Sequence, residues 1–265
     1  MSFVVKPFVL PVCGQLGIHG YGLTVLAAVV LFCTVLYVKL KRIYPLSWET
    51  IGSVVVGSIG VGVAGGRLLY VLFDRDPTRG IIQIFEVWNG GLSILGVVAA
   101  LCLYVPFKLK RKNIPLFPVL DIAAVCAPLA HAIGRLGCLW AGCCFGCGTA
   151  GSCAVTYHGI TAGAPIDSPL MPIQLYSALL LFVLFLALNV LVPVFLKKSP
   201  GVLVLLYIIG ISLERFGTDF WRNDRQLGFL PFFSVYQWIA LVLAVGALLL
   251  LIGLIKNPKR HVKNR

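Results

Sequence analysis

Long apolar runs separated by short polar connections make up most of the chain. The runs long enough to cross about 30 Å of hydrocarbon, at about 1.5 Å per residue, predict seven transmembrane helices. These helices are expected at residues 21–38, 48–73, 91–107, 116–138, 171–196, 201–220 and 233–255. The pattern therefore predicts an all-α integral membrane protein with a single membrane domain, residues 1–265.

Three segments are too polar or too interrupted to cross the membrane. Residues 1–20 are broken by Pro7, Pro11 and Gly14, and no small-residue cleavage site follows an apolar core. We expect them to lie on the outer membrane surface. Residues 139–170 are rich in Gly, Ser, Thr and Pro, which predicts a small, irregular extracytoplasmic cap between the fourth and fifth helices. Residues 256–265 form a basic tail.

The composition excludes a water-soluble fold, because 59% of the residues are hydrophobic and 12% are charged, against about 25% charged residues in soluble domains. A net charge of +13 would favour an anionic partner such as nucleic acid if it covered one face. Instead, 14 of the 22 basic residues fall into four clusters between apolar runs, at residues 39–42, 108–112, 197–198 and 256–265. Most acids lie in the alternate connections. This pattern places the N-terminus outside and the C-terminus in the cytoplasm.

Three arginines lie inside the predicted helices, at Arg67, Arg135 and Arg215. An unpaired guanidinium at such a position costs from about 3 to more than 10 kcal/mol. Because the second, fourth and sixth helices run outward, all three arginines are expected near the outer leaflet. Each arginine alone could snorkel to the interface or pair with a structural acid, but three at one depth favour a shared binding function.

The sixth helix adds an acid and a further arginine to this cluster. Arg215, Asp219 and Arg222 follow at i, i+4 and i+7, which predicts one charged stripe along a helical face. Guanidinium groups bind phosphate through two parallel hydrogen bonds. The stripe therefore suits the head group of an anionic phospholipid. Glycines, which let helices approach closely, accompany these arginines at positions 65, 66, 134 and 137.

Eight short motifs in a fixed order cover most of the chain. They are His-Gly-Tyr-Gly-Leu at 19–23, Gly-Gly-Arg-Leu-Leu-Tyr-Val-Leu at 65–72, Trp-Asn-Gly-Gly-Leu-Ser at 88–93, Gly-Arg-Leu-Gly-Cys at 134–138, Gly-Cys-Cys-Phe-Gly at 142–146, Pro-Ile-Gln-Leu-Tyr at 172–176, Arg-Phe-Gly-Thr-Asp-Phe-Trp-Arg-Asn-Asp at 215–224 and Ser-Val-Tyr-Gln-Trp at 234–238. In these motifs the chain resembles the bacterial phosphatidylglycerol–prolipoprotein diacylglyceryl transferases. The expected seven-helix topology with an outside N-terminus is also that of this family.

The resemblance implies a reaction, its partners and its location. A diacylglyceryl group would pass from phosphatidylglycerol to the cysteine thiol in the signal peptide of a lipoprotein precursor, with release of glycerol phosphate. The protein would lie in the bacterial inner membrane as a multi-pass protein, with no nucleic acid partner, no cofactor and no metal. A catalytically impaired paralogue that binds phospholipid or lipoprotein is the alternative. A transporter would be favoured by internal repeats, which the sequence lacks.

The resemblance also implies site residues. Arg135 and Arg215 match the essential arginines of the family and are expected to hold the phosphate. The residues expected to bind substrate share the matched motifs or the charged stripe: Ser93, Gln174 and Tyr176, together with Arg67, Arg135, Arg215, Asp219 and Arg222.

The third helix departs from the family pattern at a position that matters for catalysis. The family has a Ser-x-His-Gly motif there, whose histidine is thought to serve catalysis, whereas this chain has Leu95. Met171 stands where the family commonly has a second histidine, and Cys138 stands where it commonly has an asparagine. If the enzyme is active, the base that takes the proton of the substrate thiol lies elsewhere in the chain, or no base is needed. His131, one turn before Arg135, and Tyr21 are the candidate catalytic residues, with His19 as a further possibility; the alternative is that His131 only packs and hydrogen-bonds.

Five cysteines cluster at the predicted cap, and they are Cys138, Cys143, Cys144, Cys147 and Cys153. Zinc ligands usually come in separated Cys-x-x-Cys pairs, and only Cys144 and Cys147 form one. In an oxidising outer compartment, disulfides are favoured over a metal site. The pairing stays open.

Overall fold

The computed structural model describes residues 3–5, 9–13, 16–43, 47–73, 91–159, 162–196, 198–223, 225 and 232–256, without the side chains of 9–13 and 16–19. Several expectations lie outside these residues. They concern the side chain of His19, residues 88–90 of one motif, Asp224, and the basic tail beyond Lys256.

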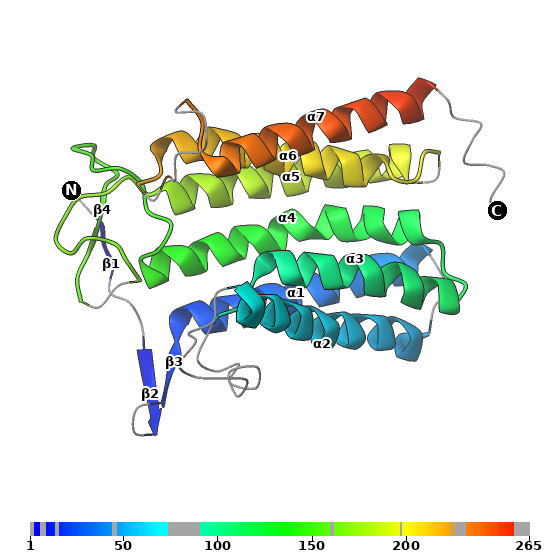
Figure 1. Cartoon of the computed structure of the whole chain (residues 1–265), viewed down its shortest axis with the longest axis horizontal. Helices are drawn as coiled ribbons and strands as arrows, with labels where there is room; N and C mark the ends of the chain where they lie inside the picture. The colour runs from blue at the N-terminus through cyan, green and yellow to red at the C-terminus, as the bar shows by residue number, and fades with distance from the viewer. Residues whose placement is uncertain are drawn as a thin grey trace. The chain divides into compact units, whose positions relative to one another are not determined.

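The described residues contain seven α-helices, drawn in Figure 1. They are α1 (Gly20–Ile43), α2 (Trp48–Phe73), α3 (Ile94–Arg111), α4 (Leu116–Ala141), α5 (Ile173–Phe195), α6 (Val202–Thr218) and α7 (Val235–Lys256). Five of them, α1, α2, α4, α5 and α7, are long and apolar enough to cross a membrane. The other two correspond to predicted helices but have only 18 residues in α3, which ends in basic residues, and 17 in α6.

The chain forms two compact units, residues 1–36 with 120–265, and residues 37–119. In the second unit, α2 and α3 pack through small residues. A Cβ added to Gly65 would meet Ala100 and the Gly96 carbonyl, and one added to Gly96 would meet Leu69 and the Gly65 carbonyl. The amide of Ser93, just before α3, donates to the Gly66 carbonyl at 3.0 Å. Glycines at positions 65 and 66 therefore permit close helix packing, as the sequence indicated.

In the first unit, α5, α6 and α7 lie side by side (Figure 1). Val202 and Leu205 of α6 pack against Ala247 and Leu251 of α7 in one apolar cluster. Much of the remaining helix surface is apolar and exposed, as for Leu179 of α5, which is 62% exposed. Exposed apolar side chains on long helices are the pattern expected where lipid replaces water.

A buried acid holds the beginning of α6. Asp121 of α4 is 0% exposed, and its carboxylate accepts from the amides of Gly201 at 2.7 Å and Val204 at 3.0 Å. These amides are unpaired at a helix N-terminus, where the helix dipole also favours a negative charge. Gly201 has φ 98°, a conformation that glycine adopts without strain. Asp121 thus fixes the position at which α6 begins.

The segment before α1 and the cap contain strands that the sequence did not predict. Strand β1 (Phe3–Val5) pairs in parallel with β4 (Val155–Tyr157), and β2 (Val9–Cys13) pairs antiparallel with β3 (Leu16–His19). Residues of β4 and its neighbours form a small apolar core of Phe145, Val155, Tyr157, Ala164 and Leu170. The segment before α1 is therefore joined to the cap through β1. Strands of three residues are too short to be predicted from a sequence pattern.

Gly137 allows α1 and α4 to approach closely. A Cβ at this position would collide with the side chain of Thr24, and it would lie 3.3 Å from Tyr21. Around Gly134, one turn earlier on α4, nothing lies within 4 Å of an added Cβ. The two glycines make a matched pair for testing this contact.

We expect Gly137→Ala to lower the unfolding temperature in detergent, because overpacking costs about 1–3 kcal/mol. Gly134→Ala should leave the unfolding temperature unchanged or raise it, since alanine is the better helix former by up to about 1 kcal/mol. Thermal unfolding followed by circular dichroism measures both. Equal stability of the two variants would contradict the proposed contact.

Candidate active site

Asp219 is the acid around which the charged residues of α6 are arranged. It is 1% exposed and begins the short 3-10 helix η4 (Asp219–Trp221) that follows α6. Its Oδ1 lies 3.3 Å from Nη2 of Arg215, and its Oδ2 accepts a hydrogen bond from Ser234 Oγ, just before α7. Arg215 also lies over the ring of Tyr236, 4.6 Å from its centroid. The carboxylate therefore joins α6 to α7 and fixes one guanidinium.

The predicted stripe along α6 is half right. Arg215 and Asp219 form the expected i, i+4 pair. The prediction is wrong for Arg222, because α6 ends at Thr218 and Arg222 has an extended backbone, with φ −78° and ψ 138°. Arg222 instead bridges to Gly146 in the cap and is 7% exposed. The turn directs this arginine toward the loop that contains Cys144.

Arg135 and His131 come from α4, half-buried and one turn apart. His131 lies within electrostatic range of Arg135 and Arg215, and Arg215 in turn lies within range of Arg222. Nε of Arg135 is buried and makes no hydrogen bond. Arg135, Arg215 and Arg222 therefore form one basic cluster in the first unit, and one of its buried donors is available to an anion.

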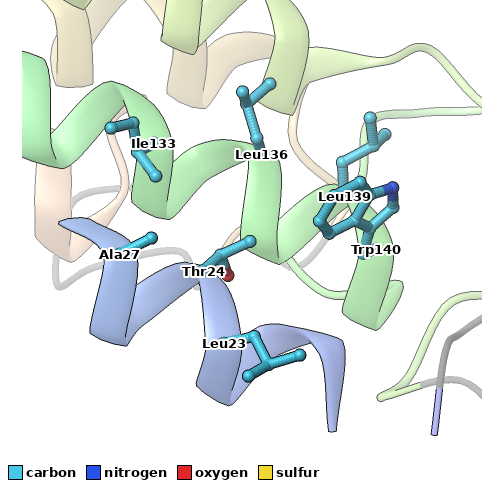
Figure 2. A pocket seen from close by; sticks show the side chains of 7 residues that line it. All are labelled: Leu23, Thr24, Ala27, Ile133, Leu136, Leu139 and Trp140. Carbon is cyan, nitrogen blue, oxygen red and sulfur yellow. The ribbon is translucent and has the colours of Figure 1, made fainter.

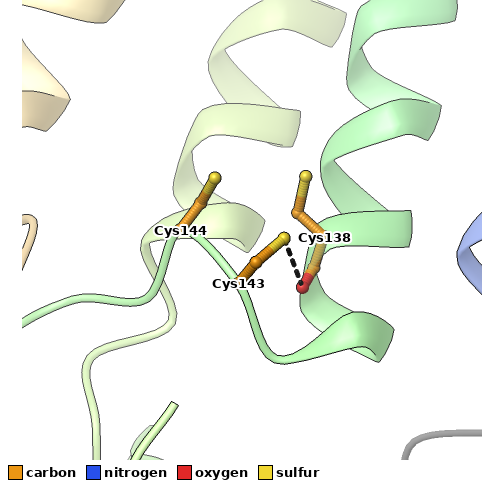
Figure 3. A group of neighbouring side chains, drawn as sticks. All are labelled: Cys138, Cys143 and Cys144. Carbon is orange, nitrogen blue, oxygen red and sulfur yellow. Dashed lines mark hydrogen bonds between the residues drawn. The ribbon is translucent and has the colours of Figure 1, made fainter. Parts of the chain in front are cut away.

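Three thiols meet beside this basic cluster. The sulfurs of Cys138, Cys143 and Cys144 all lie within 4.8 Å of one another (Figure 3). Cys138 is at the end of α4, and the other two follow in a turn where Cys144 has φ 57°. We name these three residues the thiol cluster. The expected disulfides are absent here, because these three cysteines, Cys147 and Cys153 are all free.

Neighbouring groups make the thiols of this cluster unequal. Hydrogen bonds with the thiols of Cys138 and Cys143, together with Arg222, hold the pKa of Cys144 well below its ordinary value, against the effect of burial. The pKa of Cys143 is raised by its hydrogen bonds with Cys138 and Cys144 and by burial. Arg222 therefore favours the thiolate form of Cys144.

Gln174 fixes the thiol cluster from the side of α5. Its Nε2 donates to the Cys143 carbonyl at 2.8 Å and to the Tyr157 hydroxyl at 3.2 Å. Burial raises the pKa of Tyr157 to about 12, so its hydroxyl stays protonated. Gln174 is 1% exposed, and its Oε1 has no hydrogen-bond partner. A buried acceptor without a partner is uncommon and indicates a place for a polar ligand.

Tyr21 links α1 to the same region. It is 45% exposed and lies within electrostatic range of Arg135 and of all three thiols of the cluster. Of the two candidate catalytic residues, Tyr21 is thus beside the thiol cluster, and His131 is beside the arginines. The structure brings both into the first unit with the basic cluster.

An apolar cavity of about 480 Å³ lies between α1 and α4 (Figure 2). Thr24 is its one polar lining residue, and its hydroxyl donates to the Tyr21 carbonyl at 2.7 Å. The other lining residues are Leu23, Ala27, Ile133, Leu136, Leu139 and Trp140. Leu136 directly follows Arg135 in the chain, but Arg135 itself does not line the cavity. An apolar lining of this kind suits a hydrocarbon chain.

The second unit holds two further predicted residues. Arg67 is 4% exposed, so it does not snorkel; Nη1 donates to the Gly91 carbonyl at 2.7 Å, and the guanidinium lies 5.2 Å from the centroid of the Tyr70 ring. Ser93 is the residue before α3. Leu95, where the family has a histidine, is 71% exposed and has no titratable group.

Further polar residues of the matched motifs lie on α5 and at the beginning of α7. Tyr176 is 43% exposed, so it does not share the buried face of α5 on which Gln174 lies. Sequence reasoning missed Ser234 and Gln237, although both belong to the matched motif at 234–238. Gln237 is 0% exposed, and its Oε1 accepts from the Ser234 amide and from Arg225.

Five long apolar helices, with a basic cluster near the ends of α4 and α6, define a multi-pass membrane protein. A family model for prolipoprotein diacylglyceryl transferase matches residues 7–253. The chain therefore belongs to the prolipoprotein diacylglyceryl transferase family.

Individual relatives agree with this membership. A Clostridium tetani protein is 31% identical over 240 residues, which cover 89% of this chain and 92% of its own length. A Clostridium perfringens protein is 29% identical over 244 residues, or 89% and 90% of the two chains. An Agrobacterium fabrum protein is 28% identical over 257 residues, or 91% and 87%. All three are named phosphatidylglycerol–prolipoprotein diacylglyceryl transferases, with the suffix 2 for the second.

We expect Asp219→Asn to destabilise the protein by about 3–5 kcal/mol, because it leaves Arg215 without its counter-charge. The asparagine can still accept the hydrogen bond from Ser234, so the change isolates the charge. Chemical unfolding in detergent measures the loss. Asp167→Asn is the matched control: Asp167 pairs with His158 on the exposed cap at 2.5 Å, and exposed pairs contribute about 1 kcal/mol or less. Similar losses in the two variants would show that Asp219 has no special role.

Proposed function

We propose that the chain transfers the diacylglyceryl group of phosphatidylglycerol to the cysteine thiol in the signal peptide of prolipoproteins. The reaction takes place at the outer leaflet of the bacterial inner membrane and releases glycerol phosphate. The observation that carries the proposal is the basic cluster at the end of α4 and α6, in a chain whose family and relatives have this activity in their names.

The proposal includes the arrangement in the membrane. Helices α3 and α6 complete seven spans, with the N-terminus outside and the C-terminus in the cytoplasm. The basic residues at the end of α3, Lys108, Lys110 and Arg111, support a cytoplasmic position for that end. The cap would then lie outside, together with the thiol cluster and the basic cluster.

Arg135 and Arg215 hold the phosphate of the lipid and stabilise it as it leaves. The leaving phosphate gains a negative charge, and guanidinium groups fixed before the reaction stabilise that charge without reorganisation. Asp219 orients Arg215 for this role, and Arg222, which bridges to Gly146 of the cap, adds a third positive charge. The cavity between α1 and α4 supports the proposal, since its apolar lining suits an acyl chain.

Further residues bind the substrates in this proposal. Gln174 offers the lipid head group a buried acceptor, and Tyr176 lies beside it in sequence on an exposed face of α5. In the second unit, Arg67 and Ser93 are substrate-binding residues.

A catalytically impaired paralogue that binds phospholipid or lipoprotein is the second candidate. Leu95 favours it, because an exposed leucine stands where the family has a histidine. The two candidates differ in a measurable way, since a binding protein would bind phosphatidylglycerol without turnover.

The purified protein is expected to transfer label from radiolabelled phosphatidylglycerol to a precursor peptide. Arg135→Ala and Arg215→Ala should each lower transfer about 100-fold or more, because each removes a donor to the developing charge. Lys110→Ala, which removes an exposed charge at the end of α3, is the control and should leave transfer unchanged. Lipid binding without transfer by the folded wild type would establish the binding protein instead.

His131 or Tyr21 receives the proton of the substrate thiol. General base catalysis contributes about 100-fold or more, so His131→Ala or Tyr21→Phe should lower transfer by about that factor. The Tyr21 variant keeps the ring and removes only the hydroxyl. Single-turnover rates with labelled lipid measure the effect, and unchanged rates in both variants would rule out this assignment.

A further inference from the structure

The thiol cluster has no part in the mechanism described so far. Three thiols within 4.8 Å of one another lie beside the basic cluster and Tyr21. The proposed reaction, for its part, needs a route to a thiolate nucleophile in a chain that has Leu95 in place of a histidine. The position of the cluster suggests that these two facts are connected.

The geometry of the thiol cluster suits a metal ion that prefers sulfur. In a tetrahedral zinc site, zinc–sulfur bonds of about 2.3 Å place the sulfurs about 3.8 Å apart. The three sulfurs here already lie within 4.8 Å, and Figure 3 shows Cys138 and Cys144 pointing the same way with Cys143 between them. Side-chain rotations of a small amount would complete the site.

The backbone around the thiol cluster is held in place before any metal binds. The Cys143 amide donates to the Cys138 carbonyl at 3.1 Å, so the turn is joined to the end of α4. Gln174 fixes the Cys143 carbonyl from α5. Gly142, with φ 70°, permits the tight turn that brings the two following thiols back toward Cys138. Fixed ligands lower the conformational cost of binding a metal.

The charges around the cluster also suit a metal bound by three thiolates. A zinc ion with three thiolates has a net charge of −1, which needs a positive neighbour away from water. Arg222 is 7% exposed and interacts with the Cys144 sulfur, and Arg215 lies within electrostatic range of it. The basic cluster would therefore stabilise the complex.

The number of ligands points to a catalytic site. In the described part of the chain, the cluster supplies three metal-binding side chains. Structural zinc sites have four protein ligands, whereas catalytic ones have three and leave the fourth position to water or substrate. Zinc has no redox chemistry, and it lowers the pKa of a thiol bound to it so far that the thiol is deprotonated.

We propose that Cys138, Cys143 and Cys144 bind a zinc ion whose fourth position takes the cysteine thiol of the lipoprotein precursor. This proposal rests on the proposed diacylglyceryl transfer and deepens it. Zinc coordination supplies the thiolate that the family histidine cannot supply here. Soluble thiols or water occupy the fourth position between turnovers.

On coordination, the precursor thiol loses its proton, which passes through Tyr21, beside the thiol cluster, to water. The zinc-bound sulfur then forms a bond to the glycerol carbon of phosphatidylglycerol, and the bond between that carbon and the phosphate oxygen breaks. The electron pair of that bond goes to the oxygen, so glycerol phosphate leaves toward Arg135 and Arg215. The thioether product is neutral, binds zinc weakly and dissociates.

Cobalt(II) binding to the purified full-length protein in detergent tests the site without reference to activity. We expect one cobalt per chain with a sulfur-to-cobalt charge-transfer band, displaced by zinc. Cys138→Ser, Cys143→Ser and Cys144→Ser should each weaken the band and the affinity. Cys147→Ser and Cys153→Ser, which change exposed cysteines of the same cap, are controls and should bind as the wild type does. Absence of the band in the folded wild type, or its persistence in all three cluster variants, would overturn the proposal.

A precursor peptide tests the fourth position. A precursor peptide with its cysteine should raise the intensity of the charge-transfer band by the amount expected for one more thiolate ligand. A peptide with serine at that position should leave the band unchanged. No difference between the two peptides would overturn the substrate-binding part of the proposal.

The pH dependence of transfer separates a catalytic zinc from a structural one. A free thiol with a pKa of about 8.5 is only about 3% ionised at pH 7, so transfer by chelator-treated protein should be about 30-fold slower than by zinc-loaded protein at that pH. Below pH 8, the rate of transfer by the chelator-treated protein should rise about tenfold per pH unit. The rate of transfer by the zinc-loaded protein should change little with pH. Equal rates with and without zinc would overturn this proposal and leave the transferase function intact. If cobalt binds and its band responds to the peptide, but the protein transfers no lipid, the metal site stands and the transferase function is overturned.

Discussion

A charge that leaves water must meet an opposite charge or a dense set of hydrogen bonds, and in this protein the buried carboxylate of Asp219 meets that requirement. It pairs with Arg215, accepts from Ser234 before α7, and lies where α6 changes into η4. Without this acid, Arg215 would lose its counter-charge. The direction of its guanidinium therefore depends on this one ion pair.

In the proposed reaction, the same basic cluster would serve two chemical needs. A departing phosphate gains negative charge, and sulfur ligands around a metal also carry negative charge. Arg222 interacts with the Cys144 sulfur, and Arg215 lies within electrostatic range of both Cys144 and Arg135. Nucleophile and leaving group would thus be stabilised by neighbouring members of one set of arginines.

The sequence predicted the helices well because long apolar runs have one stable structure in a bilayer. The second helix, 48–73, was right at both ends, and the i, i+4 pair of Arg215 and Asp219 was also correct. Arg222 was misplaced, because helical spacing assumes that a helix continues, and nothing local marks Thr218 as its end. The thiol cluster could not be predicted either, since the side chains come together only once the turn at Gly142 has formed. The pairing of β1 with β4 depends on contacts between distant residues, such as Phe3 with Val155.

The capping of α6 by Asp121 has a consequence for biosynthesis. The acid precedes Gly201, whose amide it accepts, by 80 residues, so α4 leaves the ribosome well before α6 does. During cotranslational insertion, the helix that carries Arg215 therefore gains its N-terminal partner only if α4 is already in the bilayer. Formation of this hydrogen bond therefore requires that α4 be in place first. If α4 inserts late or in the wrong orientation, the N-terminal amides of α6 lack the Asp121 carboxylate, and Arg215 lacks a fixed position.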